Sequence, residues 1–233
     1  MILLHRDLIG NDNGLFLVLV ASTLFALFVG VGFHEACHAY MANSLGDKTP
    51  KSQGRTTLNP LAHLETTGTL MMLFVGFGWG KPVQFNPFGL RVSPKTATLL
   101  VSAAGPLSNF LAAFVLALPI KLGWVPYINP FGSVFGVSGG TEYVGLFLTG
   151  AVYLNVILGT FNLLPLEPLD GFKVALGVLP DPIANEFAKL RRYGIGPLLL
   201  VLFVIPFATG YNPLSQIIGP IAVRLLRLFT GIG

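Results

Sequence analysis

The chain has 233 residues, of which 53% are hydrophobic and only 10% are charged, and its mean hydropathy is +0.72. Soluble domains usually carry about 25% charged residues, so this composition excludes an ordinary soluble protein. The net charge of +4 comes from basic residues in loops between apolar runs, with no basic and aromatic patch. We therefore expect a multi-pass integral membrane protein whose surroundings are a lipid bilayer, and no nucleic-acid partner.

Six apolar runs are predicted, at residues 15–41, 68–79, 96–120, 143–165, 195–209 and 213–230. A helix needs roughly 20 mostly apolar residues to cross a membrane, and the second run is too short to span easily. We expect an all-α polytopic membrane protein of about five to six transmembrane helices. The run 68–79 is expected to be re-entrant or interfacial.

Loop charge predicts the topology if 68–79 enters and leaves on the same side. All basic residues except Arg6 and Lys121 then face the cytosol, in agreement with the positive-inside rule. The N-terminus is expected outside and the C-terminus inside, in the plasma membrane.

The first apolar run contains His34-Glu35-Ala36-Cys37-His38. One helical turn separates the two histidines, so both can bind one metal while Glu35 reaches a water beside it. Ionisable groups at membrane depth cost about 2.5 kcal/mol or more each, and a metal satisfies all three. The alternative is that they pair with one another inside a helical bundle. Cys37 is interpreted as apolar filler.

A tetrahedral catalytic zinc needs a third protein ligand and an open position. His63 and Asp170 are the two candidates, and His63 falls in a polar stretch typical of a loop. Pro165 and Pro168 disrupt helical hydrogen bonding and Gly171 relaxes the backbone, so Asp170 can turn back toward the bundle interior. The sequence therefore favours Asp170, with the two motif histidines, as the ligands of one zinc per chain.

Two asparagines are further candidates. Asn162 lies about two turns before Asp170, and its amide can donate to an oxyanion or to a substrate backbone; the alternative is a helix–helix hydrogen bond. Asn109 shares a stripe with Ser102 and Gly105 that permits close helix contact. We consider Asn109 as a substrate-binding residue, but favour the structural role.

The segment 80–95 has strand-like residues interrupted by prolines. Non-helical backbone lies at membrane depth only beside protein or a water-filled cavity, so this segment is a candidate for a re-entrant element. The alternative is a cytosolic loop that lies on the headgroups.

The chain resembles the site-2 proteases, which are intramembrane zinc metalloproteases, in their compact form without an inserted peptide-binding domain. The H-E-x-x-H motif begins at His34, and N-x-x-P-x-x-x-L-D-G runs from Asn162 to Gly171. Stretches at 54–69, 78–87 and 103–110 also resemble signatures of the compact members, so the likeness covers about residues 15–175. Departures from the family pattern are Glu167 and the segment Glu65-Thr66-Thr67.

The resemblance implies that His34, His38 and Asp170 bind zinc, and that Glu35 is the general base and then the proton donor. It also implies a small re-entrant β element whose edge pairs with an unwound transmembrane substrate, through Lys81, Pro82, Val83, Gln84 and Phe85. The active site would lie toward the cytosolic half of the bilayer. A zinc transporter or an inactive scaffold is the alternative function.

The implied organisation has three parts. They are an N-terminal segment 1–14, a catalytic transmembrane core 15–175 with the re-entrant region at about 46–95, and a part 176–233 with a cytosolic loop and C-terminal transmembrane helices.

Overall fold

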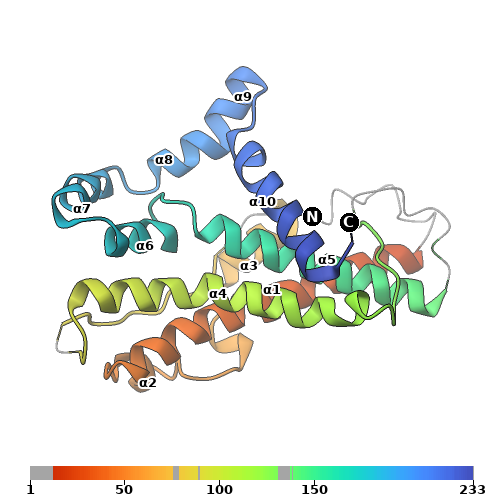
Figure 1. Ribbon diagram of the computed structural model, residues 1–233, viewed down its shortest axis with the longest axis horizontal. Coiled ribbons are helices and arrows are strands. Elements are labelled where there is room, and N and C mark those ends of the chain that lie inside the picture. Colours follow the sequence, from red (N-terminus) through yellow and green to blue (C-terminus); the bar gives the residue numbers. More distant parts are fainter. Residues whose placement is uncertain (1–12, 76–78, 89, 131–136, 138, 233) are drawn as a thin grey trace.

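Three long helices form the body of the protein. The computed structural model describes residues 13–75, 79–88, 90–130, 137 and 139–232. Helices α1 (Asn13–Ser44), α4 (Pro94–Lys121) and α5 (Gly140–Asn162) are each long and apolar enough to cross a membrane. Each of them contacts the other two, and they run side by side in Figure 1. Their composition and length indicate a membrane protein.

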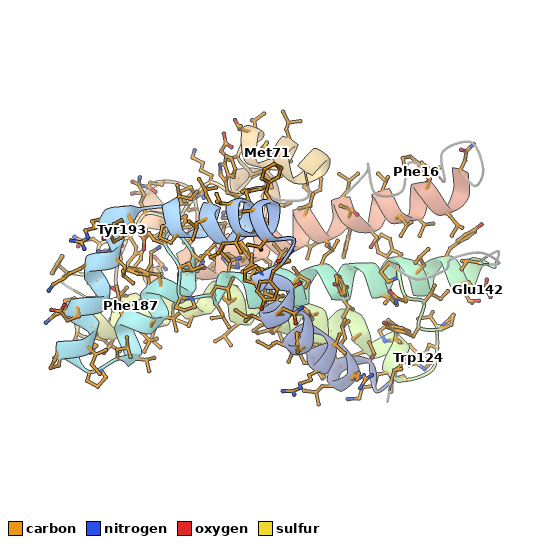
Figure 2. All side chains as sticks on the ribbon, turned by 90° about the horizontal axis from the view of Figure 1, so that it is seen from above. Phe16, Met71, Trp124, Glu142, Phe187 and Tyr193 are labelled. Atoms are coloured by element: carbon orange, nitrogen blue, oxygen red, sulfur yellow. The ribbon has the colours of Figure 1, made fainter. Side chains whose placement is uncertain are left out.

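The three long helices alternate in direction. Phe16, Trp124 and Glu142 mark the start of α1, the end of α4 and the start of α5, and all three lie at one end of the molecule (Figure 2). Phe187 and Tyr193 lie at the opposite end. The chain therefore passes up, down and up through the body, and the C-terminal halves of α1 and α5 lie beside the start of α4.

Small residues bring these helices close together. A side chain at Gly30 of α1 would overlap Leu158 of α5, and one at Gly159 of α5 would overlap Phe110 of α4. Helices in lipid associate by such close packing, because the lipid tails are as apolar as the side chains.

Ser93 caps α4 by accepting a hydrogen bond from the amide of Thr96.

The other helices are shorter, and they are α2 (Thr49–Ser52), η2 (Pro60–Ala62), α3 (Thr66–Val75), α6 (Asp170–Val178), α7 (Asp181–Ala188), η3 (Lys189–Tyr193), α8 (Gly196–Leu199), η4 (Leu200–Val204), α9 (Ile205–Thr209) and α10 (Pro213–Thr230). Helix η4 is a π-helical turn that continues α8 into α9. The stretches 181–193 and 196–209 together qualify as a fourth, broken span with a bend of 72°.

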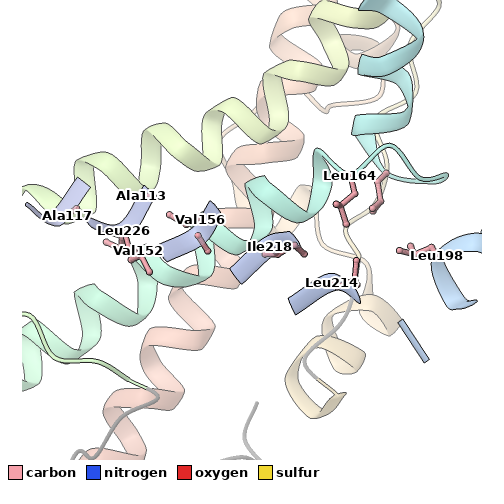
Figure 3. Packing of buried hydrophobic residues seen from close by; sticks show 11 residues of the cluster. Ala113, Ala117, Val152, Val156, Leu164, Leu198, Leu214, Ile218 and Leu226 are labelled. Atoms are coloured by element: carbon pink, nitrogen blue, oxygen red, sulfur yellow. The ribbon is translucent and has the colours of Figure 1, made fainter. Parts of the chain in front are cut away.

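Helix α10 lies across α4 and α5 and completes the main apolar core (Figure 3). Ile218 and Leu226 of α10 are buried against Ala113, Val152 and Val156. Leu198 of α8 is also buried in this core, whereas α9 projects away from the body (Figure 1), and its Phe207 is 96% exposed. The C-terminal part thus contributes α10 to the core and leaves apolar side chains of α9 exposed.

The predicted all-α class is confirmed for the described residues, which contain no strand. Five to six spans are not confirmed, because three helices qualify, or four with the bent pair, and α10 does not. The ten residues of α3 are about 15 Å long, half of the roughly 30 Å of a bilayer core. The β element is not confirmed either, since one isolated antiparallel bridge joins Leu64 and Gly80.

Some predictions fall outside the described residues. Most of the segment 1–14 and residues 76–78 of the run 68–79 are among them.

Candidate active site

The three predicted metal ligands come together from distant parts of the chain. His34 and His38 lie one turn apart on α1, and Asp170 is the first residue of α6. The two Nε2 atoms are 3.0 Å apart, and each is 3.0 Å from Oδ2 of Asp170. Two atoms that bind one tetrahedral zinc at about 2.0–2.1 Å lie about 3.3 Å from each other, so this triangle has the size that zinc requires.

The hydrogen bonds behind the two rings decide which nitrogens face the cluster. Nδ1 of His34 is 2.7 Å from Oδ1 of Asn109, and Nδ1 of His38 is 2.6 Å from the carbonyl oxygen of Val101. Both oxygens only accept, so each Nδ1 carries the proton and each neutral ring offers a lone pair at Nε2. Two such lone pairs and a carboxylate oxygen repel one another unless a cation lies between them. The donor set therefore fits a zinc ion.

Gly105 of α4 leaves the space that a metal needs. A Cβ atom at this position would lie 2.6 Å from Nε2 of His34 and closer still to Nε2 of His38. Contacts below 3.0 Å require something to shift, and both rings are fixed by their Nδ1 hydrogen bonds. Glycine is thus the residue that keeps this side of the cluster open.

The turn before Asp170 forms as the prolines predict. Helix α5 ends at Asn162, and α6 begins at Asp170 after a short non-helical stretch. A Cβ at Gly171 would overlap the carbonyl groups of Leu163 and Leu164, so only glycine fits there. Burial raises the pKa of the Asp170 carboxyl, but when no metal occupies the Nε2 lone pairs, the charge of protonated His38 and hydrogen bonds from both imidazoles outweigh burial and hold that pKa below its ordinary value. The carboxylate is therefore ionised beside the imidazoles.

Glu35 lies beside the ligands and is not one of them. Among the described residues its carboxylate accepts no hydrogen bond, and it is half-buried. A Cβ at Gly80 would lie 3.3 Å from Cγ of Glu35, so the backbone near residue 80 packs against this side chain. A free carboxylate one residue from a metal ligand is placed to exchange protons.

His63, the rejected ligand candidate, is fully buried outside the cluster. Its Nε2 lies 2.8 Å from the carbonyl oxygen of Thr57, and its own carbonyl accepts a hydrogen bond from the amide of Lys81 at 2.7 Å. Within the described part of the chain, the one group of potential ligands close enough for a metal is His34, His38 and Asp170.

The two asparagines have different surroundings. Asn109 is fully buried, and besides His34 it contacts the carbonyl oxygen of Gly30 at 3.0 Å and Oδ1 of Asn155 at 3.2 Å through Nδ2. Its amide is thus engaged within the protein, which favours the structural role, and substrate binding by Asn109 stays a prediction. Asn162 donates to the carbonyl of Leu158 in its own helix at 3.0 Å, so its catalytic role stays a prediction.

The predicted substrate-binding residues Lys81, Pro82, Val83, Gln84 and Phe85 form an extended segment. Lys81, Pro82 and Gln84 are exposed, whereas Val83 and Phe85 are half-buried. This alternation along residues 82–85 is that of a strand. The segment is not part of the metal cluster, but it begins beside Gly80 and therefore beside Glu35.

Comparison with curated proteins finds clear relatives. The chain is 36% identical over 223 residues to a Bacillus subtilis protein named "Putative zinc metalloprotease YwhC", and the match covers 93% of this chain and 94% of that protein. The chain belongs to this family of zinc metalloproteases. No family model matches the chain, and no solved structure was found to match it.

Two further members of the metalloprotease family are more distant. The match to "Putative zinc metalloprotease Rip2" of Mycolicibacterium smegmatis is 27% identical and covers 83% of this chain and 69% of that protein. "Zinc metalloprotease MJ0392" of Methanocaldococcus jannaschii is also 27% identical, over 77% of this chain, which spans 40% of the relative's length. The names of these relatives agree with the zinc-sized donor set.

Sequence reasoning missed several residues around the metalloprotease site. Gly105 was assigned to helix packing, and Arg55 was treated as a topology signal. The backbone carbonyl of Val101 carries no side-chain signal at all. Arg55 is in fact 4% exposed, and no pattern in the sequence predicts its burial.

Proposed function

We propose that this chain is an intramembrane zinc metalloprotease of the site-2 type. It hydrolyses peptide bonds within or near transmembrane segments of membrane-protein substrates, as in regulated intramembrane proteolysis. The observation that carries the proposal is a zinc-sized cluster built on α1, a helix long and apolar enough to cross a membrane. Ionisable residues are rare in membrane-spanning helices because they are costly there, so metal ligands in such a helix indicate chemistry carried out within the membrane.

Some of the site residues bind the metal, and others transfer protons or contact the substrate. His34, His38 and Asp170 hold one zinc ion per chain, which when bound activates water and polarises the scissile carbonyl. Glu35 takes the proton of the attacking water and returns it to the leaving amine, so no covalent intermediate is needed. Asn162 is assigned to the oxyanion or to the substrate backbone.

The substrate must be extended where it is cut. An intact helix hides each carbonyl in its own hydrogen bonds, so a transmembrane substrate has to unwind first. The extended segment 82–85 offers a backbone edge on which such an unwound stretch can pair, with recognition through main-chain hydrogen bonds. Sequence-tolerant cleavage at helix-breaking sites is the expected outcome.

The proposed setting is the plasma membrane, with the active site toward the cytosolic half. Glu35 lies in the C-terminal half of α1, and the basic loops follow that end of the helix.

The deciding experiment is the Glu35→Gln variant, assayed with a tagged transmembrane substrate in liposomes. We expect zinc content and folding near wild type and a loss of cleavage toward the upper part of the roughly 10²- to 10⁴-fold range of general acid–base residues. Glu186→Gln, at an exposed site on α7, is the matched control. Cleavage by Glu35→Gln at the wild-type rate with equal zinc would exclude the protease mechanism and favour metal transport.

A further inference from the structure

A buried arginine lies behind the segment on which the substrate is proposed to bind. Arg55 is 4% exposed, and its guanidinium donates to two backbone carbonyls, that of Ala62 through Nη1 and that of Lys81 through Nη2. Arginine is almost never buried unless it is paired, because removing its charge from water is costly. Arg55 therefore joins two separate segments of the chain by charge-assisted hydrogen bonds, and we call this pair of bonds the Arg55 clasp.

Both clasped segments rest on α1 next to the catalytic motif. Ala62 ends helix η2, whose Pro60 would be 2.7 Å from a Cβ at Gly32 of α1. Lys81 follows Gly80, where a Cβ would lie 2.8 Å from Cγ1 of Val31 and 3.3 Å from Cγ of Glu35. Arg55 therefore holds the start of the extended segment on the face of α1 that carries Glu35.

The other end of the segment is anchored separately. Oδ2 of Asp47 accepts a hydrogen bond from the amide of Asn86 at 2.7 Å, and the amide of Arg91 donates to the carbonyl of Leu45 at 3.1 Å. Between these anchors, residues 82–85 make no backbone hydrogen bond with any other described residue. A segment fixed at both ends and unpaired in its middle is a template for an added strand.

The charge of Arg55 also interacts with the catalytic carboxylate. Its Nε has no hydrogen-bond partner in the described part of the chain, and neither has Nδ1 of the fully buried His63. Burial lowers the pKa of the Arg55 guanidinium, and the carboxylate of Glu35 opposes that shift. Arginine stays protonated in proteins, so Arg55 supplies a fixed positive charge whose field reaches Glu35.

We propose that Arg55 is a positioning residue for proteolysis, which fixes the extended segment 79–85 in register beside Glu35. A substrate strand that pairs with residues 82–85 is then delivered with its scissile carbonyl at the metal ligands. This inference rests on the proposed function. Misplacement of a bound substrate by about 1 Å is enough to cost roughly 100-fold in rate, so such a clasp affects turnover without touching the substrate.

The test compares Arg55→Gln and Arg55→Lys with wild type by three measurements. They are zinc content, hydrogen exchange at the amide of Lys81, and kcat and KM for a transmembrane substrate in liposomes. For Arg55→Gln we expect unchanged zinc, exchange at Lys81 at least about 10-fold faster, and kcat/KM about 10- to 100-fold lower, mainly through kcat. Arg55→Lys keeps the charge but not the fork, so it should recover part of both losses.

Lys51→Gln, which removes an exposed charge from the same loop, should behave as wild type. Unchanged exchange in Arg55→Gln would overturn the clasp, and faster exchange with wild-type kcat and KM would overturn its role in positioning. If Arg55→Gln does not fold, wild-type values of all three measurements in Arg55→Lys overturn the proposal. A wild-type protein that cuts no substrate contradicts the proposed protease instead, because exchange at Lys81 is independent of activity.

Discussion

Gly105 carries a hydrogen atom where any other residue has a Cβ atom, and this leaves the space for zinc beside the two imidazoles. We predict that Gly105→Ala lowers zinc affinity by more than the roughly 10- to 100-fold typical of residues that support a metal ligand, because the added Cβ lies 2.6 Å from Nε2 of His34. Zinc content of the purified variant, measured by metal analysis after dialysis, checks this. Gly219→Ala on α10, where an added Cβ meets no atom within 4 Å, is the control and should keep its zinc.

The two asparagines should separate metal binding from rate. Asn109→Ala removes the acceptor for Nδ1 of His34, so we expect zinc affinity to fall about 10- to 100-fold. Asn162→Ala should retain zinc, because no described contact joins Asn162 to the cluster. It should lower kcat, because the proposed hydrogen bond to the oxyanion or the substrate backbone is lost. Zinc titration and substrate cleavage on both variants decide between the two roles. Equal zinc affinity in Asn109→Ala and wild type would contradict the positioning role of Asn109.

At the scale of elements, the sequence predicted the elements that carry strong local signals. The run around His34 became α1, and the prolines before Asp170 became the turn that returns this carboxylate to the histidines. The segment 80–95 was expected to include a β element, but its start is held by the Arg55 side chain on the carbonyl of Lys81, and contacts between a side chain and distant carbonyls leave no periodicity in the sequence. The predicted number of spans is not confirmed, because α10 is as long as a span but is not apolar enough to qualify.

Helix α10 lies beyond the motifs, and its part in stability can be measured. Ile218 is 7% exposed within the core that α10 shares with α4 and α5, whereas the adjacent Ile217 is 49% exposed. We predict that Ile218→Ala lowers the free energy of unfolding by about 2–5 kcal/mol, since it leaves a cavity. Thermal unfolding in detergent measures this, with Ile217→Ala as the neighbour expected to change little. Equal losses for both variants would mean that α10 is not packed as described.

For the whole molecule, loop charge and the ends of the helices predict one topology. Ser52 and Asn185 lie in the loops 46–67 and 173–194 that are expected in the cytosol, and Trp124 lies at the opposite end of the body (Figure 2). Single cysteines at these sites, in a Cys37→Ala background, should be labelled from the inside at 52 and 185 and from the outside at 124. Labelling of Ser52→Cys only from outside would reverse the orientation.

The separation of the metal ligands along the chain has a consequence for biosynthesis. Two ligands belong to α1, which leaves the ribosome before α4 and α6, and the third follows 136 residues after His34. A nascent chain that has inserted α1 and α4 still has only an incomplete donor set, so tight zinc binding waits until the turn at Asp170 has formed. If the chain is the protease proposed above, its activity arises only after the helices have assembled around the three ligands, and an unfinished chain is inactive.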